Sequence, residues 1–249
     1  MSGGEMVGED APPLASAEPV AGMPAGVLGW TTGREAGSFG LGSEEPVRST
    51  MFRWNALFDE LAAQGVHRVA SATQVHGADV VRHGSGWRGW LRLRGVDGHI
   101  SAEPGTALVV TVADCTPVFL AHPSGVVAAL HAGWRGTAAG ILGAGLEAMA
   151  HLGCPAQECT VHLGPAICGA CYEVGPEVFE AVTGTRPASK GLLDVRAVLA
   201  DQAASRGVRE LTISPRCTRC DQARFFSHRG GDEGRQLGVI ALLPTPAAV

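Results

Sequence analysis

Apolar residues along this chain gather in short continuous runs, and these runs predict buried β-strands. The segments 107–113 (ALVVTVA) and 126–131 (VVAALH) are almost entirely apolar, which is typical of strands covered on both faces. Shorter runs predict further strands at 27–32, 66–72, 80–82, 158–163, 211–214 and 237–243. The pattern therefore predicts a core built mainly from sheet.

Apolar residues at helical spacing predict helices between these strands. In 53–64, residues Trp54, Leu57 and Leu61 would share one face, and Gly65 would end the helix. Further helices are predicted at 137–151, 176–182 and 195–206. Strands and helices mix without a strict alternation, so the predicted fold class is α/β or α+β with a mixed sheet. Without an internal repeat or a central linker, we expect one catalytic domain over 27–249.

The N-terminal segment 1–26 is rich in Gly, Pro, Ala and Glu, and we expect a disordered leader there. Residues 1–33 contain neither Lys nor Arg, so they lack the positively charged region of a signal peptide. The longest apolar run, 107–120, is interrupted by Asp114 and is too short to span a bilayer. We therefore expect a cytoplasmic protein that does not act at a membrane.

Charge and cysteine content narrow the function classes. The chain has 249 residues and a formal net charge of −5, which argues against a general nucleic-acid binder. Seven cysteines are an odd number, so they exclude a fully paired disulfide scaffold and favour a reducing compartment. The abundance of Cys and His then needs another explanation.

Three potential metal ligands stand where predicted strands end: His76 in QVHG, Cys115 in ADCTP and His131 in HAGWRG. Functional residues commonly occupy such positions, although each alone is also an ordinary buried histidine or thiol. If the three converge, they would bind Zn²⁺ and leave a fourth position open, as catalytic zinc sites do. The same ligands also suit Cu²⁺. Because no two of the nine histidines are two residues apart, a multicopper cluster is not expected.

Four other cysteines form two CxxC pairs, Cys168 with Cys171 and Cys217 with Cys220. They look like the halves of a zinc site, but the segment between them is far longer than the roughly 15–20 residues of a zinc ribbon. Spatial convergence would make a closed Cys₄ site, and unreactive loop thiols are the alternative.

Several motifs occur along the chain in this order: QVHGADV, DGHIS with ADCTPV after it, ALHAGWRGTAAGI, GPAICGACYEVG and FFSHRGGDEGRQLGVI. Over residues 27–244 the chain thereby resembles the laccase-domain family, also called the multicopper polyphenol oxidase family, whose members have been reassigned as purine nucleoside phosphorylases. The resemblance implies a single-domain α/β/β/α sandwich with mixed β-sheets, similar to hydrolases that use a Cys–His pair. It also implies that His76, Cys115 and His131 are the metal ligands at the catalytic site.

The activity implied by the resemblance is phosphorolysis of adenosine, inosine and methylthioadenosine, with adenosine deamination alongside. Its partners would be a small-molecule nucleoside and phosphate. A related branch, the peptidoglycan editing factor, implies an alternative: an amidase that removes a misincorporated amino acid from a UDP-muramyl precursor, with Cys115 or zinc-bound water attacking the amide. A copper-dependent polyphenol oxidase is a further alternative.

Phosphorolysis needs an anion site, and Arg135 stands in a glycine-flanked turn at the start of a predicted helix, where backbone N–H groups favour anions. Arg34 and Arg229 are further candidates to bind phosphate, although an ordinary surface salt bridge is the alternative for each of the three arginines. Asp114 would either orient an imidazole or cap a turn. Trp134 would stack on a purine or pack in the core.

Overall fold

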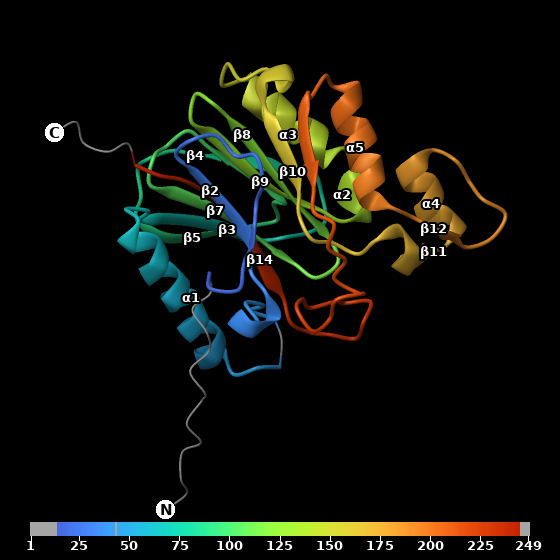
Figure 1. The fold of residues 1–249 in the computed structure, drawn as a ribbon, viewed down its shortest axis with the longest axis horizontal. Coiled ribbons are helices and arrows are strands. Elements are labelled where there is room, and N and C mark those ends of the chain that lie inside the picture. The colour runs from blue at the N-terminus through green and yellow to red at the C-terminus, as the bar shows by residue number, and fades with distance from the viewer. Residues whose placement is uncertain (1–13, 43, 245–249) are drawn as a thin grey trace, which may run out of the picture.

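The computed structural model describes residues 14–42 and 44–244, which form two β-sheets packed face to face with helices on their outer sides (Figure 1). The first sheet has the order β1 (Glu18–Pro19), β2 (Val27–Thr31), β14 (Gln236–Leu242), β7 (Thr106–Val112), β3 (Arg68–Thr73) and β5 (Gly89–Arg94). The second has the order β13 (Glu210–Ile213), β10 (Thr160–Leu163), β8 (Thr116–His122), β9 (Val126–Ala132), β6 (Gly98–Ser101) and β4 (Val80–His83).

Both sheets are mixed. In the first, β3 is parallel to β5 and β7, whereas β14 is antiparallel to β2 and β7. In the second, β10 is parallel to β13 and antiparallel to β8. A small separate ladder joins β11 (Glu173–Val174) to β12 (Gly191–Leu192). The predicted mixed-sheet fold is therefore confirmed.

Strands β7, β8, β9 and β14 form the centre of the two sheets, and their apolar sequences follow from this position. Every residue of β8, β9 and β14 is buried. Between the sheets, side chains of Val110, Phe119, Val127 and Ile240 belong to one cluster. Gly238 lets the sheets approach closely, since a Cβ there would lie 2.7 Å from the Cβ of Pro117.

Helix α1 (Val47–Ala63) covers the outer face of the first sheet. Its Trp54 is 1% exposed and stacks on Trp90 of β5, with ring centroids 4.6 Å apart. The helix begins at Val47 and not at the predicted residue 53, because the apolar residues Val47 and Phe52 of its first turns are exposed and do not continue the apolar face of Trp54, Leu57 and Leu61. Short 3₁₀ turns lie at Arg34–Ala36, Ala156–Glu158 and Gly169–Cys171.

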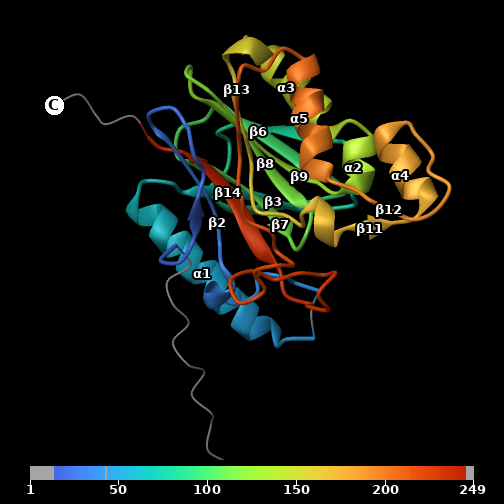
Figure 2. The same cartoon turned by 45° about the vertical axis from the view of Figure 1, so that its right-hand side comes forward.

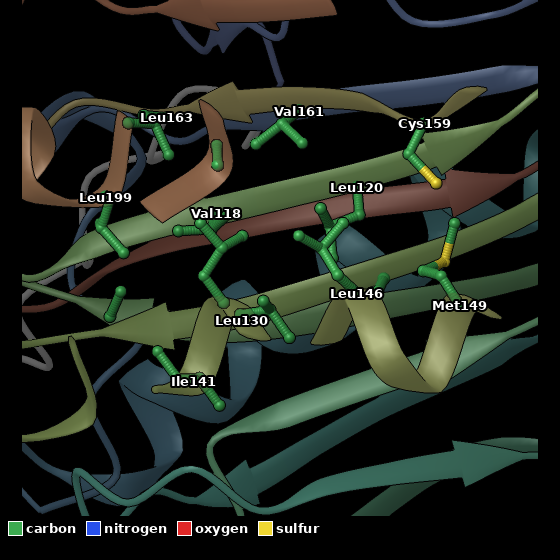
Figure 3. Close-up of a cluster of buried hydrophobic side chains, with 14 of the residues drawn as sticks. Val118, Leu120, Leu130, Ile141, Leu146, Met149, Cys159, Val161, Leu163 and Leu199 are labelled. Atoms are coloured by element: carbon green, nitrogen blue, oxygen red, sulfur yellow. The ribbon is translucent and has the colours of Figure 1, made fainter. Parts of the chain in front are cut away.

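The outer face of the second sheet is covered by α2 (Trp134–Ala138), α3 (Ile141–Ala150) and α5 (Val195–Ser205), and α4 (Pro176–Thr183) packs on α2 and α5 (Figure 2). In Figure 3, Leu146 of α3 lies against Leu120 of the sheet, and Met149 lies on the side toward Cys159, in the same buried cluster. The order of layers is helix, sheet, sheet, helix, as expected for an α/β/β/α sandwich. No helix within residues 14–42 and 44–244 combines the length and the apolarity needed to cross a membrane.

The structure divides the predicted helix 137–151 into α2 and α3. The division falls at Gly140, whose φ of +84° places it in the left-handed region. Glycine adopts this conformation without the steric cost that a Cβ imposes, so the chain ends one helix and turns into the next. The predicted helix also starts too late, because α2 begins at Trp134, directly after β9.

The expected leader over 1–26 is wrong for residues 14–26, whereas residues 1–13 lie outside the described part of the chain. Strand β1 pairs with β2, and the Val20 N–H donates to the Gly29 carbonyl at 2.8 Å. Leu14 and Ala17 pack against the cluster beneath α1. This Gly- and Pro-rich segment thus adds a strand to the edge of the first sheet, and its few apolar residues pack against the core beneath α1. The composition of the segment does not reveal these contacts.

Candidate functional site

His76, Cys115 and His131 converge, although they come from different sheets. His76 follows β3 of the first sheet, and Cys115 lies in the connection from β7 to β8, which joins the two sheets. His131 is in β9, where it pairs with Pro117 of β8 and therefore lies beside that connection. The possible ligand atoms of the three side chains all lie within 4.8 Å of one another. The structure thus brings together the three side chains whose convergence the sequence could not show.

Two residues at this cluster have a positive φ, a backbone conformation that residues other than glycine rarely adopt. His76 has a φ of +61° and Asp114 a φ of +81°. Such strained residues persist only where surrounding contacts fix them, and they concentrate at functional sites. Beside them, Gly133 leaves the space that the ligands need, because a Cβ there would lie 2.8 Å from the Cys115 Sγ.

Asp97 is the residue that holds the two histidines in place. Its carboxylate is fully buried and accepts hydrogen bonds from the backbone N–H groups of Val75, His76 and Gly77, at 3.0, 2.9 and 2.8 Å. Its Oδ1 also lies 2.8 Å from Nδ1 of His131. Burial alone would raise the pKa of Asp97, but the hydrogen bonds from His131, Gly77 and Val75 outweigh it and lower that pKa. A carboxylate bound to Nδ1 leaves Nε2 of His131 as the nitrogen for a metal.

Electrostatics favour a charged thiolate in the metal-free site. Burial would raise the pKa of Cys115, but the charge and hydrogen bonds of His131 and His76 lower it to about 6. Burial would likewise lower the pKa of His131, but the Cys115 thiolate and Asp97 raise it to about 9. At pH 7 the metal-free pair is therefore a thiolate beside an imidazolium. A thiolate is the form of cysteine that binds metals and acts as a nucleophile.

The donor set fits a metal ion. One thiolate and two imidazoles, with a carboxylate behind one imidazole, match the ligand types and the supporting hydrogen bond of three-ligand zinc centres. The cluster also opens onto a cavity, so the fourth position of a bound metal would face it. This cavity has a volume of about 410 Å³ and is lined by His76, Ala113, Asp114, Cys115, Ala132, Gly133, Trp134, Arg135, Ile167, Tyr172, Val195, His228 and Arg229.

Two of the predicted arginines line this cavity. Arg135 is exposed, and its guanidinium lies 4.4 Å from the centroid of the Trp134 ring. Arg229 is also exposed, and its guanidinium donates to the Glu173 carbonyl at 2.8 Å and lies 4.9 Å from the centroid of the Tyr172 ring. The cavity wall therefore presents positive charge and aromatic rings beside the candidate metal ligands.

Arg34 has a different position. Its guanidinium forms a 2.5 Å ion pair with Asp232, donates to the Phe225 carbonyl at 3.0 Å and lies over the Phe226 ring. It is not among the described residues that line the cavity. The structure brings Arg135 and Arg229 to the cluster, and it does not bring Arg34 there.

The structure gives Asp97, and not Asp114, the role of orienting an imidazole. From the sequence, only Asp114 was considered for this role. The Asp114 carboxylate accepts hydrogen bonds from the Thr218 hydroxyl and from the Arg229 backbone N–H, both at 2.6 Å. It therefore joins the β7–β8 connection to the C-terminal loop, whereas Asp97 orients the imidazole. The signal for Asp97 was its position in DGHIS, an acidic residue directly before a short buried strand. Sequence reasoning also missed Tyr172, the one tyrosine of the chain, and His228.

Comparisons with known proteins identify the family of this chain. The family described as multi-copper polyphenol oxidoreductase laccase matches residues 40–243. A protein of Streptomyces coelicolor named purine nucleoside phosphorylase SCO2081 is 40% identical over 195 residues, which cover 74% of this chain and 80% of the relative. A Streptomyces griseus protein named purine nucleoside phosphorylase ORF3 is 37% identical over 208 residues, covering 75% of this chain and 85% of the relative.

A solved structure has the same fold. The crystal structure of YlmD from Geobacillus stearothermophilus is 30% identical and matches with a TM-score of 0.81, covering 88% of this chain and 93% of YlmD. The family match extends over most of the described residues and confirms the resemblance carried by the motifs around His76, Cys115 and His131. The chain belongs to the multi-copper polyphenol oxidoreductase laccase family.

Proposed function

We propose that this chain is a zinc-dependent purine nucleoside phosphorylase that cleaves adenosine, inosine and methylthioadenosine with phosphate and also deaminates adenosine. The observation that carries the proposal is the cavity, which combines the three candidate metal ligands with Arg135 and Arg229. Relatives at 34–40% identity that are named purine nucleoside phosphorylases support it. In this proposal, residues 27–249 act as one catalytic domain.

His76, Cys115 and His131 would hold the zinc ion, with Asp97 fixing His131 and the loop that carries His76. When bound, such an ion supplies Lewis acidity and lowers the pKa of a coordinated water. Gly133 keeps the space beside the ligands clear. The ring of Trp134, which is half-buried in the cavity wall, offers a flat apolar surface on which a purine would stack.

Phosphate would bind at the two arginines that line the cavity. A guanidinium has five N–H donors and binds an oxyanion through two of them at once. In phosphorolysis, a phosphate oxygen forms a bond to C1′ of the ribose while the bond from C1′ to the base breaks. The base leaves with that electron pair and takes up a proton. Arg135 and Arg229 would hold the attacking phosphate on the side of the cavity that faces the nucleoside.

The direct test combines the zinc-loaded protein, inosine and phosphate, and measures hypoxanthine. Release of hypoxanthine that requires phosphate is expected, and the Cys115→Ala variant should abolish it. Adenosine without phosphate tests the deaminase, with inosine as the product. Hypoxanthine at background level in the zinc-loaded wild type would refute the phosphorylase.

The role of Arg135 has its own test. Arg135→Ala should raise KM for phosphate about 10-fold or more, the loss of one charge-assisted interaction, and change KM for the nucleoside less. Arg34→Ala is the matched control, because Arg34 is paired with Asp232 away from the cavity. An unchanged phosphate KM in Arg135→Ala, or an equal rise in Arg34→Ala, would reject this anion site.

One observation favours a second function, amide hydrolysis on a cell-wall precursor. Cys115, His131 and Asp97 form a thiolate, imidazole and carboxylate in sequence, the order of groups in a nucleophilic cysteine site. The Cys115 thiolate would attack the amide carbon and form a thioester, while the C–N bond breaks and the departing amine takes the proton of His131. Water would then cleave the thioester, with His131 taking its proton, and restore the thiolate. Release of an amino acid from a UDP-muramyl substrate, without phosphate and in the presence of a chelator, would favour this function.

We place the protein in the cytoplasm as part of the proposal. All seven cysteines lie in the described residues, and none of them forms a disulfide. Disulfides are rare in reducing compartments, where thiols stay free. Nucleosides and phosphate, the proposed substrates, are the small-molecule partners.

A further inference from the structure

The two CxxC pairs, far apart in sequence, form one cluster in the structure. Cys168 directly precedes the 3₁₀ turn after β10, and Cys171 is the last residue of that turn. Cys217 and Cys220 lie in the loop after β13. The four Sγ atoms all lie within 4.8 Å of one another. This cluster is distinct from the His76–Cys115–His131 site and shares no residue with it.

Backbone contacts hold the two pairs together. Ala166 and Cys217 form a parallel β-bridge, and the Thr218 N–H donates to the Ala166 carbonyl at 3.2 Å. Backbone hydrogen bonding between the segment before Cys168 and the segment at Cys217 therefore brings the four thiols together, without any disulfide bond between the thiols themselves.

The spacing of the sulfur atoms suits a shared metal ion. Sγ of Cys171 and Sγ of Cys220 are 3.4 Å apart, whereas a disulfide bond measures about 2.05 Å. A tetrahedral ion with zinc–sulfur bonds of about 2.3 Å places its sulfur ligands about 3.8 Å apart. The cluster therefore has the dimensions of a four-thiolate site.

The most buried thiol is already surrounded by donors. Sγ of Cys217, in a residue only 8% exposed, accepts hydrogen bonds from the backbone N–H groups of Cys168 at 3.2 Å and Cys220 at 3.4 Å. Hydrogen bonds that donate to sulfur favour the thiolate form, which is the form that binds a metal. A donor from each CxxC pair thus meets the same sulfur.

We propose that Cys168, Cys171, Cys217 and Cys220 bind one Zn²⁺ as a closed structural site. Four protein ligands leave no position for substrate, which separates this site from the cavity. The zinc would join the segment after β10 to the C-terminal loop. Tyr172 follows Cys171 and lines the cavity, while Thr218 follows Cys217 and bonds to Asp114 beside Cys115. The site would therefore stabilise one wall of the cavity.

This inference does not depend on the proposed reaction, and counting zinc tests it. Protein purified with reductant and without chelator is analysed for zinc per chain in the wild type, Cys171→Ser/Cys220→Ser, Cys115→Ala and Cys154→Ser. Cys220 is exposed and Cys171 is half-buried, so the double variant should keep the fold, which circular dichroism checks. Cys154 is a buried thiol outside both clusters and is the matched control.

The expected result is the loss of one zinc per chain in Cys171→Ser/Cys220→Ser and no loss in Cys154→Ser. Cys115→Ala should keep the zinc of the four-cysteine site, whichever metal the other site holds. Cobalt reconstitution gives a second readout, because a four-thiolate cobalt site absorbs more strongly than a one-thiolate site: the double variant should lose most of the cobalt–thiolate absorption, and Cys115→Ala only a minor part. If the double variant retains all the zinc of the wild type, or if mass spectrometry of the unreduced protein shows a Cys171–Cys220 disulfide, the inference is overturned.

Discussion

Asp97→Asn is the substitution that most directly tests how the candidate metal centre is held. Each carboxylate oxygen of Asp97 has two donors: Oδ1 faces the N–H of His76 and Nδ1 of His131, and Oδ2 faces the N–H groups of Val75 and Gly77. An asparagine keeps one oxygen and presents an NH₂ group in place of the other. Whichever way the amide turns, one pair of donors faces another donor.

The expected loss can be worked from these contacts. Hydrogen bonds to a charged group contribute about 1.5–3 kcal/mol each, so two broken bonds at a fully buried site cost about 3–6 kcal/mol of unfolding free energy. Removing a carboxylate that orients a metal-binding histidine lowers metal affinity roughly 10–100-fold. Both effects arise from one side chain, because Asp97 fixes His131 and the loop of His76 together.

Zinc affinity, measured by competition with a chromophoric chelator, and urea unfolding of the metal-free protein together test the reasoning. Asp79→Asn is the matched control, since Asp79 is an exposed carboxylate just after the same loop and should leave both values unchanged. Zinc affinity of Asp97→Asn within twofold of the wild type, with an unchanged unfolding midpoint, would show that Asp97 does not organise the site.

Further expectations concern a thiol, a core aromatic residue and a buried histidine. In the metal-free protein, Cys115 should reach half its maximal alkylation rate near pH 6, since its pKa is about 6. Mass spectrometry of iodoacetamide-treated protein measures this rate, and a midpoint near pH 9 would contradict the prediction. Trp54→Ala should cost about 3–5 kcal/mol in urea unfolding, because it empties the space between α1 and the sheet. Burial lowers the pKa of His99 to about 3, so the folded state resists the proton that the unfolded chain takes up below about pH 6.5. Between these values His99 alone should lower the unfolding free energy by about 1.4 kcal/mol for each pH unit lowered. His99→Gln should remove that contribution, unlike the exposed His67→Gln.

Much of the fold could be predicted because local pattern and tertiary environment agree there. Strands β7, β9 and β14 are mostly apolar, and every residue of them except Thr111 is buried. Helix α5 was predicted within a residue at its end. Strand β6 was missed, because its sequence GHIS is short and half polar, yet every residue of it is buried. Burial of His99 and Ser101 depends on neighbouring strands, and no local pattern encodes it.

The candidate site, too, could be predicted only where the residue type itself carries the information. The chemical type of a side chain is visible in the sequence, so His76, Cys115 and His131 could be selected. The partner of a side chain is set by packing. From the sequence, Arg34 and Arg229, both in glycine-rich loops, were therefore equally good candidates to bind phosphate. In the structure, Arg34 is paired with Asp232, whereas Arg229 lines the cavity because its backbone N–H is bound by Asp114.

Asp114 also connects the two cysteine-containing clusters. It stands next to Cys115, and it accepts a hydrogen bond from Thr218, the neighbour of Cys217. The positive φ of Asp114 is imposed by these contacts, since a non-glycine residue keeps such a conformation only when its surroundings fix it. The loop that carries Cys217 therefore helps to fix the connection that carries Cys115. The CxxC pairs then matter to the cavity through the geometry of one strained connection, without contacting a substrate.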